Sequence, residues 1–261
     1  MDMPSPQLMI SPIPALKDNY VWAIIDPAQH TAWVVDPSEA KPVNEFLTQH
    51  QLTLTGILIT HHHWDHTGGI AELISHYPVP VFAPAKENIV GVTHQVHEGD
   101  EIKITPSFSL QVLEIPGHTL GHVAYYAPGI IFCGDTLFAA GCGRVFEGTM
   151  EQMYSSLQKI ASLPDDTNIY CAHEYTLNNL RFAKLVEPNN QDIDERMKRV
   201  EAMRQQHKPS LPSTLKEEKA TNPFLRCHQP EIVANLKRRT NLQSIHSIDI
   251  FSQLREWKDK F

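Results

Sequence analysis

The sequence predicts an α+β or layered sandwich domain followed by a helical region. Up to residue 172, short apolar segments alternate with Pro, Gly and Asp residues, a pattern typical of strands joined by turns. After His173 the apolar residues recur at helical spacing, and no segment there reads as a convincing strand. Strands first and helices last favour this fold class, with a boundary near residues 172–176.

Taken in order, the expected elements begin with a hairpin, because Tyr20–Ile25 and Thr31–Asp36 flank the turn-forming residues 26–30. The other expected strands are the apolar segments Thr55–Thr60, Val79–Ala83, Ser109–Ile115, Val123–Ala127, Ile130–Cys133 and Asn168–Ala172. The expected helices run from about Thr67 to His76 and over Met150–Leu163, Asn178–Val186, Ile193–Gln206, Pro230–Arg239 and Ile248–Lys258.

The composition is that of a globular protein with a sizeable core, since hydrophobic residues make up 41% of the 261 residues. The apolar runs are strand-sized, far shorter than the roughly 20 residues of a membrane span. The first ten residues lack the features of a secretory signal. Membrane, collagenous and disordered classes are thereby excluded. Because no CxxC pair occurs, we expect reduced thiols in a cytoplasmic protein at Cys133, Cys142, Cys171 and Cys227.

The net charge of −8 is unevenly distributed. Up to Ala172 there are 18 acidic and 6 basic residues, and from His173 onward there are 12 acidic and 16 basic residues. An acidic body argues against nucleic acid as a partner, because nucleic acids bind extended basic surfaces. The basic tail indicates either a local pocket for a small anion or an ordinary solvated helical surface.

The segment Thr60–His66 carries a metal-binding pattern, THHHWDH, at the end of an expected strand. Side chains alternate along an extended chain, so His61 and His63 point one way and His62 points another. Asp65 and His66 follow where the chain turns toward a helix. Four such ligands within six residues suit zinc or another first-row metal.

Three further ligand-type residues each follow an apolar strand, namely His118, Asp135 and His173. Loops at strand ends build functional sites, so we expect these residues to join the first motif. The full set suffices for two metal ions that a carboxylate can bridge at a spacing of ~3.5–4 Å. The expected division is His61, His63 and His118 on one ion and Asp65, His66 and His173 on the other, with Asp135 bridging both.

The motifs THHHWDH, PGHTLGH, GDTLF and AHEY together resemble the metallo-β-lactamase superfamily. The longer strings FAAGCGR at 138–144 and CAHEYTLNN at 171–179 resemble the glyoxalase II (hydroxyacylglutathione hydrolase) family more closely. The resemblance continues through the helical tail to LREWKDKF at 254–261, so it covers essentially the whole chain.

The resemblance implies a four-layer αβ/βα sandwich at residues 1–172 that catalyses the reaction, and a helical substrate-binding domain at residues 173–261. The implied reaction is hydrolysis of S-D-lactoylglutathione to D-lactate and glutathione, the second step of methylglyoxal detoxification. We expect a hydroxide between two divalent ions to attack, with Asp65 and Asp135 as the catalytic carboxylates, because metals lower the pKa of bound water toward about 7. Zinc is the expected metal, with iron and manganese as alternatives.

The resemblance also assigns glutathione-binding roles to Arg144, Tyr175, Arg255 and Lys258. Arg255 and Lys258 are three residues apart on an expected helix and hence share a face, which without the resemblance would be read as solvated surface. Some family members have tyrosine where this chain has Phe146, so we expect looser glutathione binding. We further expect His122 and Asp36 to orient metal ligands.

Two alternatives remain open at this point. The first is another reaction of the superfamily. Hydrolysis of β-lactams or lactones is disfavoured by the missing secretory signal, and RNA processing by the acidic net charge. Mono-iron persulfide oxidation is disfavoured because it does not need the second set of ligands. A metal-stabilised binding protein without turnover is the other alternative. We expect a monomer with a glutathione thioester as its partner and no nucleic-acid or membrane partner.

Overall fold

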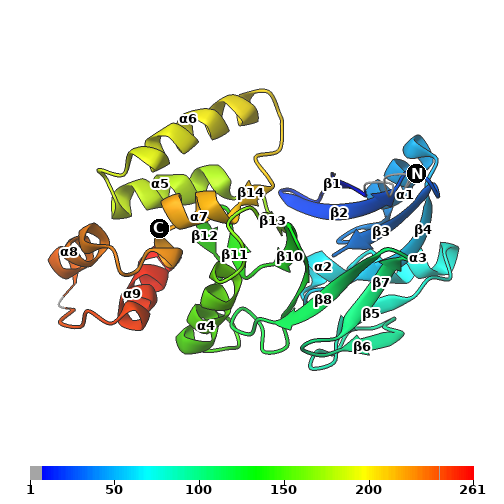
Figure 1. Ribbon diagram of the computed structural model, residues 1–261, viewed down its shortest axis with the longest axis horizontal. Helices are drawn as coiled ribbons and strands as arrows, with labels where there is room; N and C mark the ends of the chain where they lie inside the picture. Colours follow the sequence, from blue (N-terminus) through cyan, green and yellow to red (C-terminus); the bar gives the residue numbers. More distant parts are fainter. Residues whose placement is uncertain (1–7, 241) are drawn as a thin grey trace, which may run out of the picture. The chain divides into compact units, whose positions relative to one another are not determined.

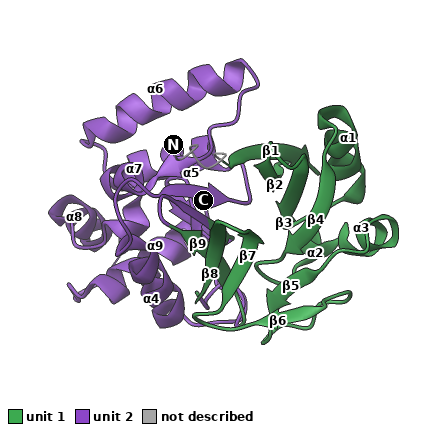
Figure 2. Ribbon diagram, turned by 45° about the vertical axis from the view of Figure 1, so that its right-hand side comes forward, with its two compact units in different colours: residues 1–114, 121–127, 132–134 green, residues 115–120, 128–131, 135–261 purple. Residues whose placement is uncertain are grey.

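The computed structural model describes residues 8–240 and 242–261. Figure 1 shows the elements in chain order, from β1 in blue to α9 in red. The chain divides into two compact units, which Figure 2 colours separately. Unit 1 comprises Met1–Glu114, Gly121–Ala127 and Phe132–Gly134, and unit 2 comprises Ile115–Leu120, Pro128–Ile131 and Asp135–Phe261.

Unit 1 contains a six-stranded sheet whose spatial order follows the sequence. Its strands are β1 (Met9–Ala15), β2 (Asn19–Asp26), β3 (Thr31–Val35), β4 (Thr53–Leu58), β5 (Val81–Pro84) and β6 (His94–Val96). The first three strands are antiparallel, whereas β3 to β6 run parallel. Parallel neighbours need a crossover connection, and helix α1 (Ala40–His50) supplies one between β3 and β4.

The core of unit 1 lies between this sheet and its helices. Val43 and Leu47 of α1 are fully buried, as are Ile70 and Leu73 of α3 (Ile70–His76). These side chains pack in one cluster with strand residues such as Ile57. Burial of apolar side chains from α1 and α3 thus fixes both helices on the sheet.

The other strands of unit 1 form an antiparallel meander, β7 (Glu101–Thr105), β8 (Phe108–Glu114) and β9 (Val123–Ala127). Strand β10 (Ile130–Gly134) crosses the boundary between the units, and its residues Phe132–Gly134 belong to unit 1.

Unit 2 contains the start of β10 together with β13 (Asn168–Cys171) and β14 (Ser213–Thr214), with β13 between the other two. A short hairpin, β11 (Leu137–Phe138) and β12 (Gly141–Cys142), follows β10. The helices are α4 (Met150–Ala161), α5 (Thr176–Val186), α6 (Gln191–Gln205), α7 (Leu215–Thr221), the 3-10 turn η1 (Pro223–Leu225), α8 (Pro230–Arg239) and α9 (Ser247–Asp259). Helix α4 begins with a capping box between Thr149 and Gln152, which satisfies two backbone donors at its start.

Most expected elements are confirmed with small shifts of their ends. The hairpin of β2 and β3 is present, and the bounds of β9 and α8 match those expected. The four cysteines are buried and form no disulfide among the described residues. No helix in the described part of the chain is long and apolar enough to cross a membrane.

Three expectations about elements are wrong. No helix was expected before Thr67, but α1 covers Ala40–His50 and α2 covers Trp64–Thr67. The helix expected from Thr67 begins only at Ile70, after Gly68 and Gly69. Cβ atoms at these two positions would lie 2.5 and 2.7 Å from the backbone oxygens of Ser38 and Pro37, so the close packing there requires glycine. A strand does occur after His173, but β14 has only two residues, too few for a sequence pattern.

Gly56 on β4 gives a test of the packing in unit 1. An added Cβ would lie 2.3 Å from Cε3 of Trp33 on the neighbouring strand β3. We expect Gly56→Ala to lower the free energy of unfolding by about 1–3 kcal/mol, because overpacking forces the indole to shift. Urea unfolding of Gly56→Ala, of Trp33→Leu and of the double variant measures this. The two losses should be less than additive, because leucine makes room for the methyl group; strict additivity would contradict the contact.

Candidate metal centre and pocket

Unit 1 brings the residues of the THHHWDH motif together in the loop after β4 and in the short helix α2 that follows it. His61 and His66 are fully buried, and His61 Nε2 lies 3.1 Å from His63 Nδ1. His66 Nε2 lies 3.7 Å from Asp65 Oδ2. His62 faces elsewhere, with its Nδ1 2.5 Å from Glu87 Oε2. The expected alternation of the histidines is therefore present.

Asp36, at the end of β3, determines which nitrogen of two histidines carries the proton. Its carboxylate accepts hydrogen bonds from the Thr60 hydroxyl (2.7 Å) and from His66 Nδ1 (3.0 Å). The Thr60 oxygen in turn accepts from His61 Nδ1 at 3.0 Å, because its own proton points to Asp36. In both rings the proton sits on Nδ1, so Nε2 carries the lone pair that a metal needs.

His122 packs against this cluster. It is fully buried, and its ring stacks on that of His61 with centroids 4.6 Å apart. Gly134 lies against the same groups, since a Cβ there would come within 2.3 Å of Thr60 Oγ1 and 2.9 Å of His122 Cε1. The orienting role predicted for His122 agrees with this packing and stays a prediction.

Unit 2 brings the other three expected ligands together. Asp135 lies between two buried histidines, with Oδ2 3.4 Å from His118 Nε2 and Oδ1 3.4 Å from His173 Nε2. Each carboxylate oxygen thus faces a different imidazole. His118 Nδ1 donates to the Arg144 carbonyl at 2.7 Å, which leaves its Nε2 as the ligand nitrogen.

These residues fit a divalent metal ion. Buried histidines with a hydrogen-bonded Nδ1 and a nearby carboxylate are the donor set that zinc, iron and manganese bind in proteins. His61, His66 and His118 meet that description, and each has its orienting partner within its own unit.

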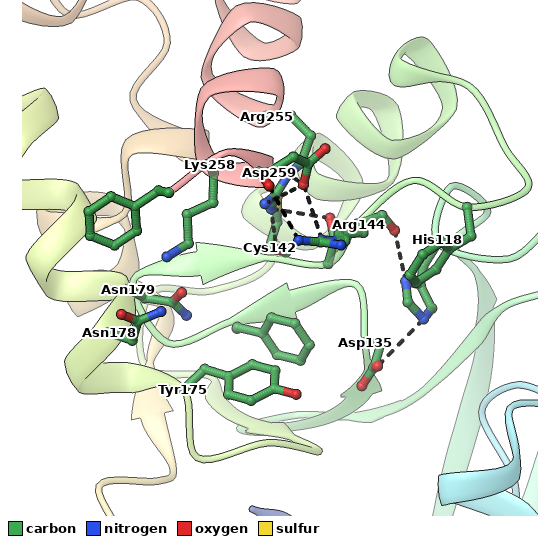
Figure 3. Close-up of a pocket in the computed structure, with 14 residues that line it drawn as sticks. His118, Asp135, Cys142, Arg144, Tyr175, Asn178, Asn179, Arg255, Lys258 and Asp259 are labelled. Atoms are coloured by element: carbon green, nitrogen blue, oxygen red, sulfur yellow. Dashed lines mark hydrogen bonds and ion pairs between the residues drawn. The ribbon is translucent and has the colours of Figure 1, made fainter.

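A pocket of about 390 Å³ opens in unit 2 beside His118 and Asp135 (Figure 3). Its lining includes every substrate-binding residue predicted from the sequence, namely Arg144, Phe146, Tyr175, Arg255 and Lys258. The other lining residues, none of which was predicted to bind substrate with its side chain, are Phe138, Cys142, Gly143, Asn178, Asn179, Asp259 and Phe261.

The three cations of the pocket differ in their surroundings. Arg255 is only 3% exposed, and it donates to the Cys142 carbonyl at 2.7 Å and to Asp259 Oδ1 at 3.0 Å. The exposed Arg144 also pairs with Asp259 Oδ1, at 3.3 Å. The spacing of Arg255 and Asp259, four residues apart on one helix, could have revealed their pair from the sequence.

Lys258 is the cation without a counter-charge. Its buried Nζ has no hydrogen-bond partner among the described residues and lies 4.6 Å from the ring centroid of Phe261. Burial, helped by the positive charge of Arg255, lowers the pKa of Lys258 to about 8. Burial raises the pKa of the neighbouring Cys142 thiol to about 11, so it stays protonated.

The aromatic residues frame the candidate ligands. The Tyr175 ring stacks on that of His173 with centroids 4.7 Å apart. Phe146 is 62% exposed, and its ring contacts His118 edge-on at 5.3 Å. A phenylalanine at this place offers no hydroxyl to a ligand in the pocket.

Comparison with known proteins identifies the class first. The family model for the metallo-beta-lactamase superfamily matches residues 20–173. The crystal structure of ETHE1 from Myxococcus xanthus is similar with a TM-score of 0.65, at 24% identity over 97% of this chain and 99% of that chain. With the clustered His and Asp side chains, these matches define a protein of the metallo-β-lactamase fold that binds divalent metal ions. The fold class predicted from the sequence is confirmed.

A second family model, hydroxyacylglutathione hydrolase C-terminus, matches residues 174–261. The hydroxyacylglutathione hydrolase of Nitrosomonas europaea is 48% identical over 97% of this chain and 96% of its own length. That of Vibrio cholerae is 49% identical over 97% of this chain and its whole length. The chain therefore belongs to the hydroxyacylglutathione hydrolase family, as its motifs predict.

The role of Asp36 can be tested by metal retention. We expect Asp36→Asn to weaken metal binding about 10- to 100-fold, because the amide cannot accept from His66 Nδ1 and Thr60 as the carboxylate does. Metal content after dialysis against graded chelator measures this. Asp26→Asn is the matched control, since Asp26 is a buried carboxylate whose hydrogen bonds within the described residues come from the backbone N–H groups of Ala28 and Gln29. Equal retention in both variants would refute the role.

Proposed function

We propose that the protein hydrolyses S-D-lactoylglutathione and related 2-hydroxyacylglutathione thioesters to the 2-hydroxy acid and glutathione. This is the second step of methylglyoxal detoxification. The observation that carries the proposal is that one pocket is lined both by the candidate ligands His118 and Asp135 and by the uncompensated cation Lys258. The near-full-length relatives named hydroxyacylglutathione hydrolase support the choice of substrate.

We propose two ions per chain. One would be held by His61, His63 and His118, and the other by Asp65, His66 and His173, with Asp135 available to both. Support comes from the Asp135 carboxylate, whose two oxygens face different histidines at 3.4 Å. We propose zinc as the metal, with iron and manganese as alternatives. When bound, such ions act as Lewis acids and make water nucleophilic at neutral pH.

The residues of this chain have separate parts in the reaction. Asp36, Thr60 and the Arg144 carbonyl hold the protons on Nδ1 of the ligand histidines, so the lone pairs stay directed at the centre. The carboxylates of Asp65 and Asp135 are the proposed catalytic groups, because they can take up the proton that the attacking water loses. Asn19 Nδ2 donates to Asp65 Oδ2 at 3.3 Å and orients it.

A thioester suits a site of this kind. The leaving thiol has a pKa near ~8.5, so the thiolate departs with little help from a general acid. A cysteine nucleophile is disfavoured at the pocket, because the raised pKa of Cys142 keeps it a thiol. The proposal therefore needs no acid beyond the carboxylates that line the centre.

The charges of the pocket match a glutathione moiety. We propose that Lys258 and Arg144 attract its carboxylates and that Tyr175 contacts its backbone. Arg255 belongs to the same proposed site, and its bonds to Cys142 and Asp259 support a part in fixing the pocket wall. Phe146 supports looser binding, since its side chain makes no hydrogen bond.

We also propose how the chain is divided into domains, where the protein acts and that it is a monomer. Residues 1–172 form the catalytic domain, and residues 173–261 form the helical substrate-binding domain. The protein acts as a cytoplasmic monomer without a nucleic-acid or membrane partner. The free, buried cysteines are compatible with a reducing compartment.

The direct test follows hydrolysis of S-D-lactoylglutathione at the thioester absorbance, with metal content determined on the same sample. We expect rapid turnover and about two ions per chain, the number that typical two-metal hydrolytic sites hold. Two bound ions without thioester turnover would contradict the substrate, and the same sample would then be tested on β-lactams and lactones. Turnover with a single bound ion per chain would contradict the dinuclear centre but not the proposed substrate.

The lowered pKa of Lys258 predicts a pH dependence. Below about pH 8 the free protein carries the ammonium, and above it the charge is lost, so kcat/KM for the glutathione thioester should fall. The kcat should stay level, because a bound carboxylate favours the charged form and raises the pKa of Lys258 in the complex. Lys258→Met should lower kcat/KM about tenfold at pH 7, and it should abolish the decrease of kcat/KM above about pH 8. A small neutral thioester is the control, and a similar loss with it would refute the anion contact.

A further inference from the structure

The turn between β11 and β12 forms part of the pocket wall and adopts a strained conformation. Ala140 has a φ of 55°, in the left-handed region that residues with a Cβ disfavour. Its methyl group is buried among Leu180 and Ala183 of α5 and Ile193 of α6. Surrounding contacts must therefore hold the turn in place.

Side chains from the helical region hold the backbone of this turn. The Ala140 N–H donates to Glu218 Oε2 at 2.7 Å. Asn222 Nδ2 donates to the carbonyls of Phe138 at 3.1 Å and Gly141 at 2.9 Å, and it also contacts Glu218 Oε2 at 3.0 Å. The buried polar groups of the turn thus depend on Glu218 and Asn222, together with Asn179, whose Nδ2 donates to the Ala139 carbonyl at 3.0 Å.

Glu218 is itself fixed by a buried ion pair. It is fully buried, and its Oε1 accepts from Arg196 Nη2 at 2.6 Å. Arg196 Nη1 donates to the Thr221 hydroxyl at 2.6 Å. Desolvation of such a pair offsets much of its attraction, so stability alone explains it poorly. Its geometry instead aims one carboxylate oxygen at the turn.

The turn leads directly into the residues that face the pocket. Phe138 precedes it, and Cys142, Gly143 and Arg144 follow it, all lining the pocket. The backbone of Arg144 also accepts from His118 Nδ1, as described above. Figure 3 shows this bond and the placement of Arg144 between His118 and Asp259.

We propose that Glu218 is a positioning residue of the pocket, which acts through the Ala140 turn to fix Cys142–Arg144 for binding of the glutathione moiety. Neither Glu218 nor Arg196 lines the pocket, so the effect is transmitted through the backbone. The choice of ligand rests on the proposed function above.

The test compares Glu218→Gln with Glu187→Gln. Glu187 is also buried and pairs with an arginine, Arg226, at 2.7 Å, but in the described part of the chain its carboxylate makes no hydrogen bond or ion pair to the turn. We expect Glu218→Gln to raise KM for the glutathione thioester about tenfold and to change kcat less than about twofold. Glu187→Gln should lower the melting temperature without that rise in KM. Equal KM values in the two variants would overturn the proposal.

A rescue separates positioning from stability. The Ala140 N–H and Arg196 bind different oxygens of Glu218, so the single carbonyl oxygen of glutamine can take the place of only one of them. In the double variant Arg196→Met with Glu218→Gln, the oxygen is released for Ala140. We expect KM to return toward the wild-type value while the melting temperature stays low. A KM that stays raised as stability falls would count against the proposal.

Two measurements that do not depend on turnover test the role of Glu218 separately from the proposed function. Calorimetry of the metal-loaded protein with glutathione should show weaker binding in Glu218→Gln, and amide hydrogen exchange at residues 139–144 should be about tenfold faster than in Glu187→Gln. A wild-type protein that neither hydrolyses the thioester nor binds glutathione would refute the proposed function, and the exchange rates would then decide whether Glu218 positions the turn. Should Glu218→Gln fail to fold, Asn222→Ala carries the same expectations, because it removes the donors to Phe138 and Gly141.

Discussion

A neutral imidazole has one nitrogen with a proton and one with a lone pair. The candidate metal centre depends on which nitrogen of each histidine carries the lone pair. In both units, a hydrogen-bond acceptor on the far side of the ring determines which nitrogen carries the proton. Asp36 acts on His66 directly and on His61 through Thr60, whereas a backbone carbonyl acts on His118. Without these acceptors, the candidate ligands His61, His66 and His118 would be buried histidines of undefined tautomer.

Contacts between side chains also determine the charge of the pocket. Asp259 accepts from Arg255 and pairs with Arg144, so two guanidinium groups share one carboxylate. The remaining positive potential is concentrated at Lys258, where aromatic rings replace a counter-ion. A pocket that neutralised every cation internally would have no attraction left for an anionic ligand.

Local patterns in the sequence predicted much of the fold and the candidate site. His61, His63 and His66 lie within one short segment, and His118, Asp135 and His173 each follow an apolar strand, so spacing alone was informative. The Arg144 carbonyl and Glu218 gave no such signal, because they act on residues 26 and 78 positions away. Likewise β14 pairs two residues with β13 across the whole of α5 and α6, a contact that no local pattern encodes.

The burial of the cysteines has a consequence for how the protein tolerates glutathione itself. Desolvation raises the pKa of Cys142 to about 11 and that of Cys171 to about 12, so almost no thiolate exists at neutral pH. Attack on oxidised glutathione requires that thiolate and access to it. In the pocket proposed for glutathione, Cys142 is thus protected from forming a mixed disulfide with the oxidised form of the product.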